Sequence, residues 1–215
     1  MGNIQGFIFG AAFRFLALMP ALTFHEFAHA YSAYRLGDPT PKMQGRVSLN
    51  PLDHLDPLGT LMILFAPIGW AKPVNINPRN FRDPEKGIFI SSAMGPLSNL
   101  VQGTIWGLIL RVTTPALLPP DSLVVTFLVW VTLINFVLAL FNLIPLGPLD
   151  GQSVLEYFLS PQAKMKFRQI NQYAFPILIG LIVASFVLNV PILQYVIIRP
   201  ASTLAQLASG VPMPF

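Results

Sequence analysis

Four long apolar stretches dominate the sequence and limit what the chain can fold into. Each is long enough for the roughly 20 residues that a membrane-spanning helix needs, and together they cover residues 7–34, 88–110, 123–145 and 174–198. Charged residues make up 10% of the chain and hydrophobic residues 53%, whereas soluble domains carry about 25% charged residues. A fully hydrated surface can hardly be built from this composition. We therefore expect an all-α polytopic membrane protein with about four transmembrane helices.

A fifth apolar stretch, at 58–71, is too short to be interpreted as another ordinary span. It is interrupted by Gly59, Pro67 and Gly69, and such short, interrupted segments are typical of re-entrant or interfacial structure. We predict that this segment dips into the membrane and returns. A short crossing segment is the alternative.

The basic residues favour one orientation of the chain. If 58–71 does not cross, ten of the 13 Lys and Arg residues lie on one side of the membrane, and the positive-inside rule makes that side cytoplasmic. We predict a multi-pass protein of the cell membrane with its N-terminus outside. The net charge of +4 fits loops that face an anionic lipid surface, so the bilayer is an expected partner and nucleic acid is not.

The polar segments between the apolar stretches are short. Residues 37–56 are rich in Pro, Gly and Asn, and the alternation of polar and apolar residues at 44–49 predicts a small β-hairpin at the cytoplasmic interface. No polar segment is long enough to bury a core of its own. We expect a single membrane-embedded domain over residues 1–215.

The first apolar stretch contains the residues most suited to chemistry. His25 and His29 are four positions apart, which places both imidazoles on one face of a helix, one turn apart. Glu26 lies beside His25, where a carboxylate can act as general base towards water at a metal ion. An ionisable group in a spanning helix costs roughly 2.5–3.5 kcal/mol on insertion scales. These residues therefore need a compensating partner.

A catalytic zinc ion normally has three protein ligands and one open position, so the two His residues require a third ligand elsewhere. The chain has no Cys, which leaves His54 and the carboxylates. Asp150 follows the cytoplasmic end of an inward-running span, and His29 lies near the cytoplasmic end of the first span, so both are expected at a similar depth. We predict that Asp150 is the third ligand; a simple Asp-Gly turn is the alternative.

Three ordered motifs resemble the site-2 protease family of intramembrane zinc metalloproteases, in its small branch without PDZ or CBS domains. They are His-Glu-x-x-His at 25–29, Gly-Pro-Leu-Ser-Asn at 95–99, and Asn-Leu-Ile-Pro at 142–145 leading to Leu-Asp-Gly at 149–151. The resemblance covers nearly the whole chain. It implies one zinc ion per chain, bound by His25, His29 and Asp150, with Glu26 as the catalytic base.

The resemblance also implies roles for three further residues. It places Asn99 and Asn142 near the site, where their amides could hold the substrate backbone or stabilise an oxyanion. For Asn99, an interhelical hydrogen bond is an equal alternative. His54 matches a recurrent feature of this branch. A substrate-side, gating or loop-bonding role is preferred to that of a fourth metal ligand, which would close the site, and a merely structural role is favoured over all of these.

The sequence thus predicts a zinc-dependent intramembrane endopeptidase that hydrolyses peptide bonds in or near the transmembrane segments of membrane-protein substrates. The resemblance adds a role in regulated intramembrane proteolysis, with the active site near the cytoplasmic face. A proton or cation transporter is an alternative, in which His25, Glu26 and His29 form the ion path. A non-catalytic binder of membrane proteins is another. The substrate, the trigger and the oligomeric state are not predicted, and another divalent metal could replace zinc.

Overall fold

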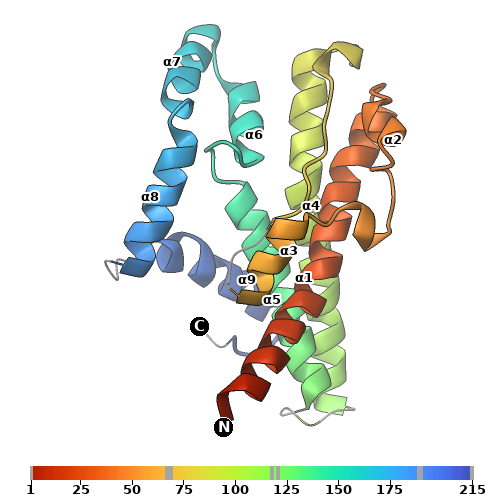
Figure 1. The fold of residues 1–215 in the computed structure, drawn as a ribbon, viewed down its shortest axis with the longest axis vertical. Helices are drawn as coiled ribbons and strands as arrows, with labels where there is room; N and C mark the ends of the chain where they lie inside the picture. Colours follow the sequence, from red (N-terminus) through yellow and green to blue (C-terminus); the bar gives the residue numbers. More distant parts are fainter. Residues whose placement is uncertain (1, 66–69, 117–118, 120–121, 188–190, 214–215) are drawn as a thin grey trace.

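The computed structural model describes residues 2–65, 70–116, 119, 122–187 and 191–213. These residues form helices and no β-sheet (Figure 1). The α-helices are α1 (Gly2–Arg35), α2 (Thr40–Met43), α3 (Pro57–Phe65), α4 (Pro84–Ala116), α5 (Leu123–Asn142), α6 (Gly151–Phe158), α7 (Pro161–Asn171), α8 (Ala174–Val187) and α9 (Arg199–Ser209). The connecting turns include two 3-10 turns and a π-helical turn: η1 (Pro51–Asp53), η2 (Pro78–Asn80) and η3 (Gln194–Ile198).

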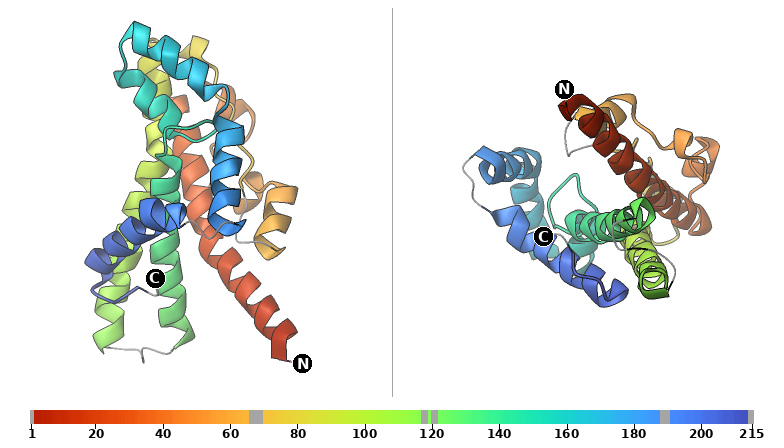
Figure 2. Two further views of the ribbon diagram at one scale, coloured as in Figure 1. Left: turned by 90° about the vertical axis from the view of Figure 1, so that its left-hand side faces the viewer. Right: turned by 90° about the horizontal axis from the view of Figure 1, so that it is seen from below.

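The long helices α1, α4 and α5 lie side by side, with α4 against both of the others (Figures 1 and 2). Ala21 and Ala30 of α1 are fully buried. A Cβ atom on Gly103 of α4 would lie 3.0 Å from the ring of Phe136 on α5. Small residues at such positions let helix backbones approach closely. Close packing of this kind is typical of helices in membranes, where the hydrophobic effect does not drive their association.

Helix α9 covers α4 and α5, whereas α8 stands apart from them (Figure 2). Leu133 and Phe136 of α5 pack against Ala201 and Ala205 of α9 in a buried apolar cluster. One buried apolar cluster therefore lies between α4, α5 and α9, and α1, which carries the two His residues, packs against α4 and α5.

The predicted spans at 7–34 and 88–110 lie within α1 and α4, and α5 covers most of 123–145. The stretch 174–198 contains α8 and η3, with residues 188–190 between them outside the described part. Among the described residues, one helix, Leu123–Asn142, is long and apolar enough by itself to cross a membrane, with a mean hydropathy of 2.6. The number of crossings therefore stays a prediction.

The two ends of the predicted dipping segment lie together. Leu55 and Ala71 form an antiparallel bridge, and the backbone N–H of Lys72 donates to the carbonyl of His54 at 2.8 Å. Between them, α3 occupies the first half of the segment, and residues 66–69 lie outside the described part.

The β-hairpin predicted at 44–49 is wrong, because these residues form no strand. The backbone N–H of Arg46 donates to the carbonyl of Pro41 at 2.8 Å, which closes a turn after α2. The carbonyl of Ser48 accepts a hydrogen bond from Nε2 of His54 at 2.7 Å. Turns and side chains thus use backbone groups that a strand ladder would need, and the short alternation in the sequence belongs to an irregular loop.

A buried carboxylate fixes this loop to the segment before α4. Asp38 is fully buried and accepts hydrogen bonds from the backbone N–H and hydroxyl of Thr40 at 3.0 and 2.6 Å, from the backbone N–H of Asn77 at 2.7 Å, and from the amide of Asn80 at 2.6 Å. Burial raises the pKa of Asp38, but these hydrogen bonds stabilise the ionised form and bring the pKa below its ordinary value.

Candidate metal centre

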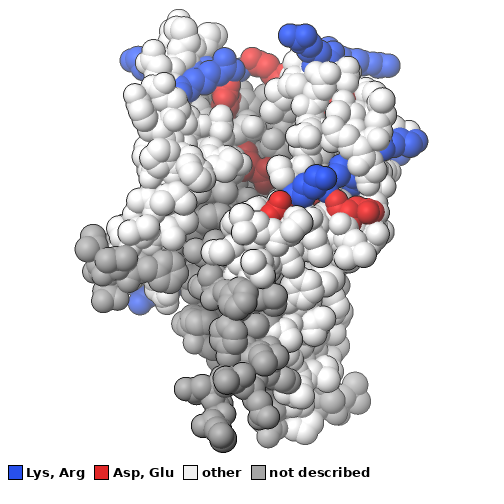
Figure 3. Space-filling view, viewed as in Figure 1, with Lys and Arg blue, Asp and Glu red and all other residues white. Residues whose placement is uncertain are grey.

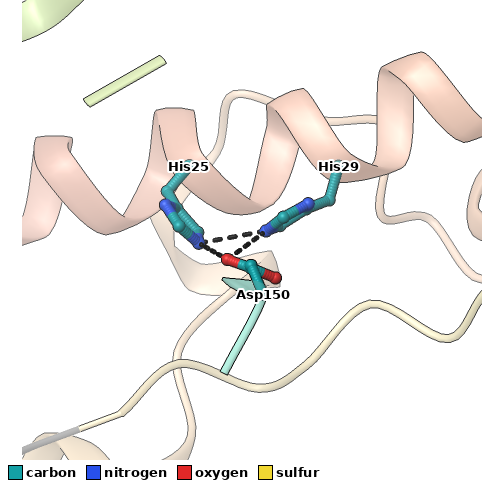
Figure 4. A group of neighbouring side chains, drawn as sticks. All are labelled: His25, His29 and Asp150. Carbon is teal, nitrogen blue, oxygen red and sulfur yellow. Dashed lines mark hydrogen bonds and ion pairs between the residues drawn. The ribbon is translucent and has the colours of Figure 1, made fainter. Parts of the chain in front are cut away.

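His25, His29 and Asp150 converge at one point inside the protein (Figure 4). The two Nε2 atoms lie 3.0 Å apart, and each lies 3.3 Å from Oδ2 of Asp150. Both imidazoles are buried. The helical spacing on α1 places the two rings one turn apart, as the sequence predicts, and the chain before α6 supplies the carboxylate.

Both imidazoles are oriented by acceptors on α4. Nδ1 of His25 lies 2.6 Å from Oδ1 of Asn99, and Nδ1 of His29 lies 2.6 Å from the carbonyl oxygen of Ser91. Because both oxygens can only accept, each Nδ1 must carry the proton and donate it. When each ring carries only this proton, its Nε2 presents a lone pair towards Asp150.

The orientation of the Asn99 amide follows from its other contacts. Its Nδ2 donates to the carbonyl of Ala21 at 3.0 Å and to Oδ1 of Asn135 at 2.9 Å, and the Asn135 amide in turn donates to the carbonyl of Val131 at 2.8 Å. An exchange of O and N in Asn99 would set its oxygen against the Ala21 carbonyl and Oδ1 of Asn135, acceptor against acceptor, so the network fixes Oδ1 towards His25.

The three converging groups fit a divalent cation. Two lone pairs and a carboxylate oxygen face one another, and Oδ2 of Asp150 has no hydrogen-bond partner among the described residues. Imidazole nitrogen and carboxylate oxygen are zinc ligands, and a ligating His characteristically donates its other N–H to a carbonyl or carboxylate oxygen. The Asp150 carboxylate is therefore available as a third ligand beside the two imidazoles.

Gly95 makes room for the two imidazoles. A Cβ atom at this position would lie 2.2 Å from Nε2 of His29 and 2.8 Å from Cε1 of His25, far inside van der Waals contact. Helix α4 can therefore approach the ligand atoms this closely only with glycine at this position.

Asp150 reaches the site because the chain turns sharply after α5. The backbone of Gly151 packs against the end of α5, where a Cβ atom would lie 2.2 Å from the carbonyl oxygen of Leu143. Asp150 occupies the N-cap position of α6, but its side chain makes no capping hydrogen bond. The Asp-Gly turn therefore does not exclude the predicted ligand role, because the carboxylate is directed at the His residues.

Glu26 lies beside the converging group and is not part of it. Its side chain is 12% exposed, and its Oε2 lies 3.9 Å from Nη2 of Arg46. The face of the molecule in Figure 3 is hollowed between α6 and the side formed by α1 and α2, with an acidic side chain visible inside the hollow. The Asp150 side chain is 20% exposed, although its Oδ2 atom is buried.

The other predicted site residues are placed differently. The Asn142 amide donates to the carbonyl of Leu138 in its own helix at 3.0 Å. His54 is buried, and the one hydrogen bond of its side chain among the described residues is the bond from Nε2 to Ser48. Neither belongs to the converging group, whereas Asn99 contacts it through His25.

Sequence reasoning missed the contributions of Ser91, Gly95 and Arg46. Ser91 acts through its backbone carbonyl, so its residue type carries no signal. Gly95 belongs to a recognised motif, but its steric role depends on how closely the helices approach. A single Arg in a turn-rich loop gave no indication of its burial.

Comparisons with known proteins agree with this geometry. A sequence model of peptidase family M50 matches residues 118–185. The protein named "Putative zinc metalloprotease YwhC" in Bacillus subtilis is 43% identical over 174 residues, which cover 78% of each chain. "Putative zinc metalloprotease Rip2" is 27% identical in Mycolicibacterium smegmatis and 31% in Mycobacterium tuberculosis; these matches cover 76% of this chain and 63% and 64% of the relatives.

No solved structure gave a significant match. The similarity to the Bacillus protein covers most of both chains, and the M50 match includes Asp150. Together with the metal-binding geometry, this shows that the chain belongs to peptidase family M50, the site-2 protease family of membrane-bound zinc metalloproteases.

Proposed function

We propose that the protein is an intramembrane endopeptidase that cleaves membrane-protein substrates in or near their transmembrane segments. The observation that carries this proposal is the convergence of His25, His29 and Asp150 within an apolar helical body, with Glu26 beside them on α1. Regulated intramembrane proteolysis is the proposed setting.

Each side chain has a defined role in this proposal. His25 and His29 bind zinc through Nε2 while their Nδ1–H bonds hold the rings in place, and Asp150 is the third ligand. When bound, zinc would polarise the scissile carbonyl and lower the pKa of water towards about 7. Glu26 takes the proton from the attacking water and delivers it to the leaving amine.

The amide side chains are assigned different tasks. All described contacts of Asn99 are within the protein, so we assign it to the orientation of His25 and not to the substrate. Asn142 uses one N–H for its own helix and retains a second, which is available to a substrate carbonyl or an oxyanion. A loop-bonding role for His54 follows from its burial and its contact with Ser48.

We propose a multi-pass arrangement with the active site near the cytoplasmic face. On the face drawn in Figure 3, the charged side chains lie chiefly in the upper half, near α2, α6 and α7, and this supports placing that end at the cytoplasmic surface. The Leu55–Ala71 bridge supports a dipping segment, because it places the end of this segment beside its beginning, at the same depth in the membrane.

A transporter or a non-catalytic binder would not require this ligand geometry. In a transporter, the groups of the ion path line a continuous route through the membrane. Here both Nδ1 atoms are held by fixed acceptors, and both Nε2 atoms point at one carboxylate. This arrangement favours a fixed metal over a mobile ion.

The proposal can be tested before any single substrate is identified. Purified wild-type protein and Glu26→Gln would each be reconstituted with a detergent extract of bacterial membrane proteins, and new N-termini would be mapped by mass spectrometry. We expect new termini within or beside apolar segments with the wild type only, while both proteins bind about one zinc per chain. Equal sets of termini from the two proteins would refute the protease assignment.

A further inference from the structure

The guanidinium of Arg46 is buried beside the candidate metal centre, in the loop that follows α2, and no role has yet been assigned to this residue. Its side chain is 4% exposed. A buried charge is costly unless its donors are used, and the planar guanidinium is the cationic group best suited to several acceptors at once. The position of Arg46 therefore depends on what its donors contact.

Two of these donors bind backbone carbonyls from different segments. Nη1 donates to the carbonyl of Asp53, and Nη2 donates to the carbonyl of Lys72. Asp53 precedes Leu55 by two residues, and Lys72 follows Ala71, the two residues joined by the isolated bridge. Arg46 thus ties together the two ends of the segment that contains α3.

The same guanidinium faces Glu26. Nη2 lies 3.9 Å from Oε2 of Glu26, beyond direct hydrogen-bond distance but within ion-pair range. Among the described residues, Arg46 is the cation that forms an ion pair with Glu26, and Nε of Arg46 has no hydrogen-bond partner there. Both side chains are largely buried, so their attraction is screened less than at a surface.

We propose that Arg46 is a positioning residue that holds the Glu26 carboxylate and the backbone at Lys72 in a fixed relation beside the metal centre. This inference rests on the proposed role of Glu26 as the base. The carboxylate extends from α1, whereas Lys72 belongs to the segment that returns from α3. Arg46 donates a hydrogen bond to the Lys72 carbonyl and forms an ion pair with Glu26, so the loop and the base keep one geometry during turnover.

The proposal predicts different behaviour for lysine and for an uncharged residue. Lysine retains a positive charge near Glu26 but cannot reach both carbonyls with a planar fork. Methionine retains much of the side-chain volume and loses the charge and all donors. Arg46→Lys should therefore preserve part of the function that Arg46→Met loses.

The test compares Arg46→Lys and Arg46→Met with the wild type and with Arg79→Met, a matched change at an exposed arginine. Zinc per chain, hydrogen exchange of the Lys72 amide, and kcat and KM for a cleaved substrate peptide would be measured. We expect wild-type zinc content in all four proteins and faster exchange at Lys72 in Arg46→Met. In that variant kcat should fall about 10- to 100-fold with KM changed less than about threefold, and Arg46→Lys should recover part of kcat.

Two results would overturn the proposal. Wild-type kcat in Arg46→Met with normal zinc content would show that Glu26 does not need Arg46. A parallel loss of zinc and of thermal stability in both variants, with normal kcat per zinc-loaded molecule, would show a merely structural role. Failure of the protease assignment itself is a separate outcome, because the wild type would then be no more active than Glu26→Gln.

Discussion

Oδ1 of Asn99 accepts the Nδ1 proton of His25 at 2.6 Å, and this hydrogen bond joins α4 to α1 at the metal centre. The bond fixes the tautomer of His25 and leaves its Nε2 available to the proposed metal ion. It also explains why an amide occupies a fully buried position in an otherwise apolar helix contact.

Replacing Asn99 by Ala should weaken zinc binding. His25 would lose the acceptor that fixes its tautomer and ring orientation, and such losses typically cost about 10- to 100-fold in metal affinity. Competition with a zinc chelator of known affinity would measure the effect. Asn142→Ala is the matched control, because its amide bonds to its own helix. Equal zinc affinity in the two variants would contradict the assigned role of Asn99.

The identity of the third ligand can be tested by metal analysis. We expect about one zinc per wild-type chain and a strong loss in Asp150→Ala, because two His residues alone do not complete a catalytic site. His54→Ala should retain zinc, since His54 lies outside the converging group. Elemental mass spectrometry of proteins purified in parallel would measure both. Zinc lost with His54 and kept without Asp150 would reverse the assignment.

Gly95→Ala should disrupt the metal centre although it adds a single methyl group. The new Cβ would lie 2.2 Å from Nε2 of His29, so either the ring or α4 must move. Zinc content should fall well below that of the wild type. Gly180→Ala is a suitable control, because a Cβ there meets no atom within 4 Å. Normal zinc binding by Gly95→Ala would show that α4 does not approach the imidazoles this closely.

Asp38 should make the loops after α1 sensitive to acid. Its folded-state pKa lies below the ordinary value, so its contribution to stability is present above the unfolded pKa of about 4 and is lost as the pH falls through the folded pKa. With zinc removed from both proteins, the melting temperature of Asp38→Asn should lie further below that of the wild type at pH 7 than at pH 3. An equal difference in melting temperature between the two proteins at both pH values would argue against this linkage.

Much of the site could be predicted from periodicity and depth. The four-residue spacing of His25 and His29 requires only an α-helix to bring the rings together. Asp150 could be predicted because it follows the end of the apolar stretch 123–145, and this end is expected at a membrane depth similar to that of the His-Glu-x-x-His motif at 25–29. These predictions need only the local helix geometry and the depth of each residue in the membrane, and both can be inferred from the sequence.

The remaining features depend on contacts between distant segments. The predicted β-hairpin at 44–49 fails because Arg46 turns inward and binds carbonyls of Asp53 and Lys72. The carbonyl of Ser91 and the missing Cβ of Gly95 matter only because α4 lies against α1 at this depth. Such contacts depend on how the whole chain packs, so no local pattern in a single sequence predicts them.

Helix α4 supplies the Nδ1 acceptor of both imidazoles of the candidate metal centre on α1. Metal binding and the docking of these two helices are therefore thermodynamically linked, and the linkage is reciprocal. If bound zinc stabilises the association of α1 with α4 by a certain free energy, separation of the two helices weakens zinc binding by the same free energy. A zinc ion bound there would stabilise the contact between the two helices in addition to its proposed catalytic role, and zinc release would report on how firmly α1 and α4 are held together.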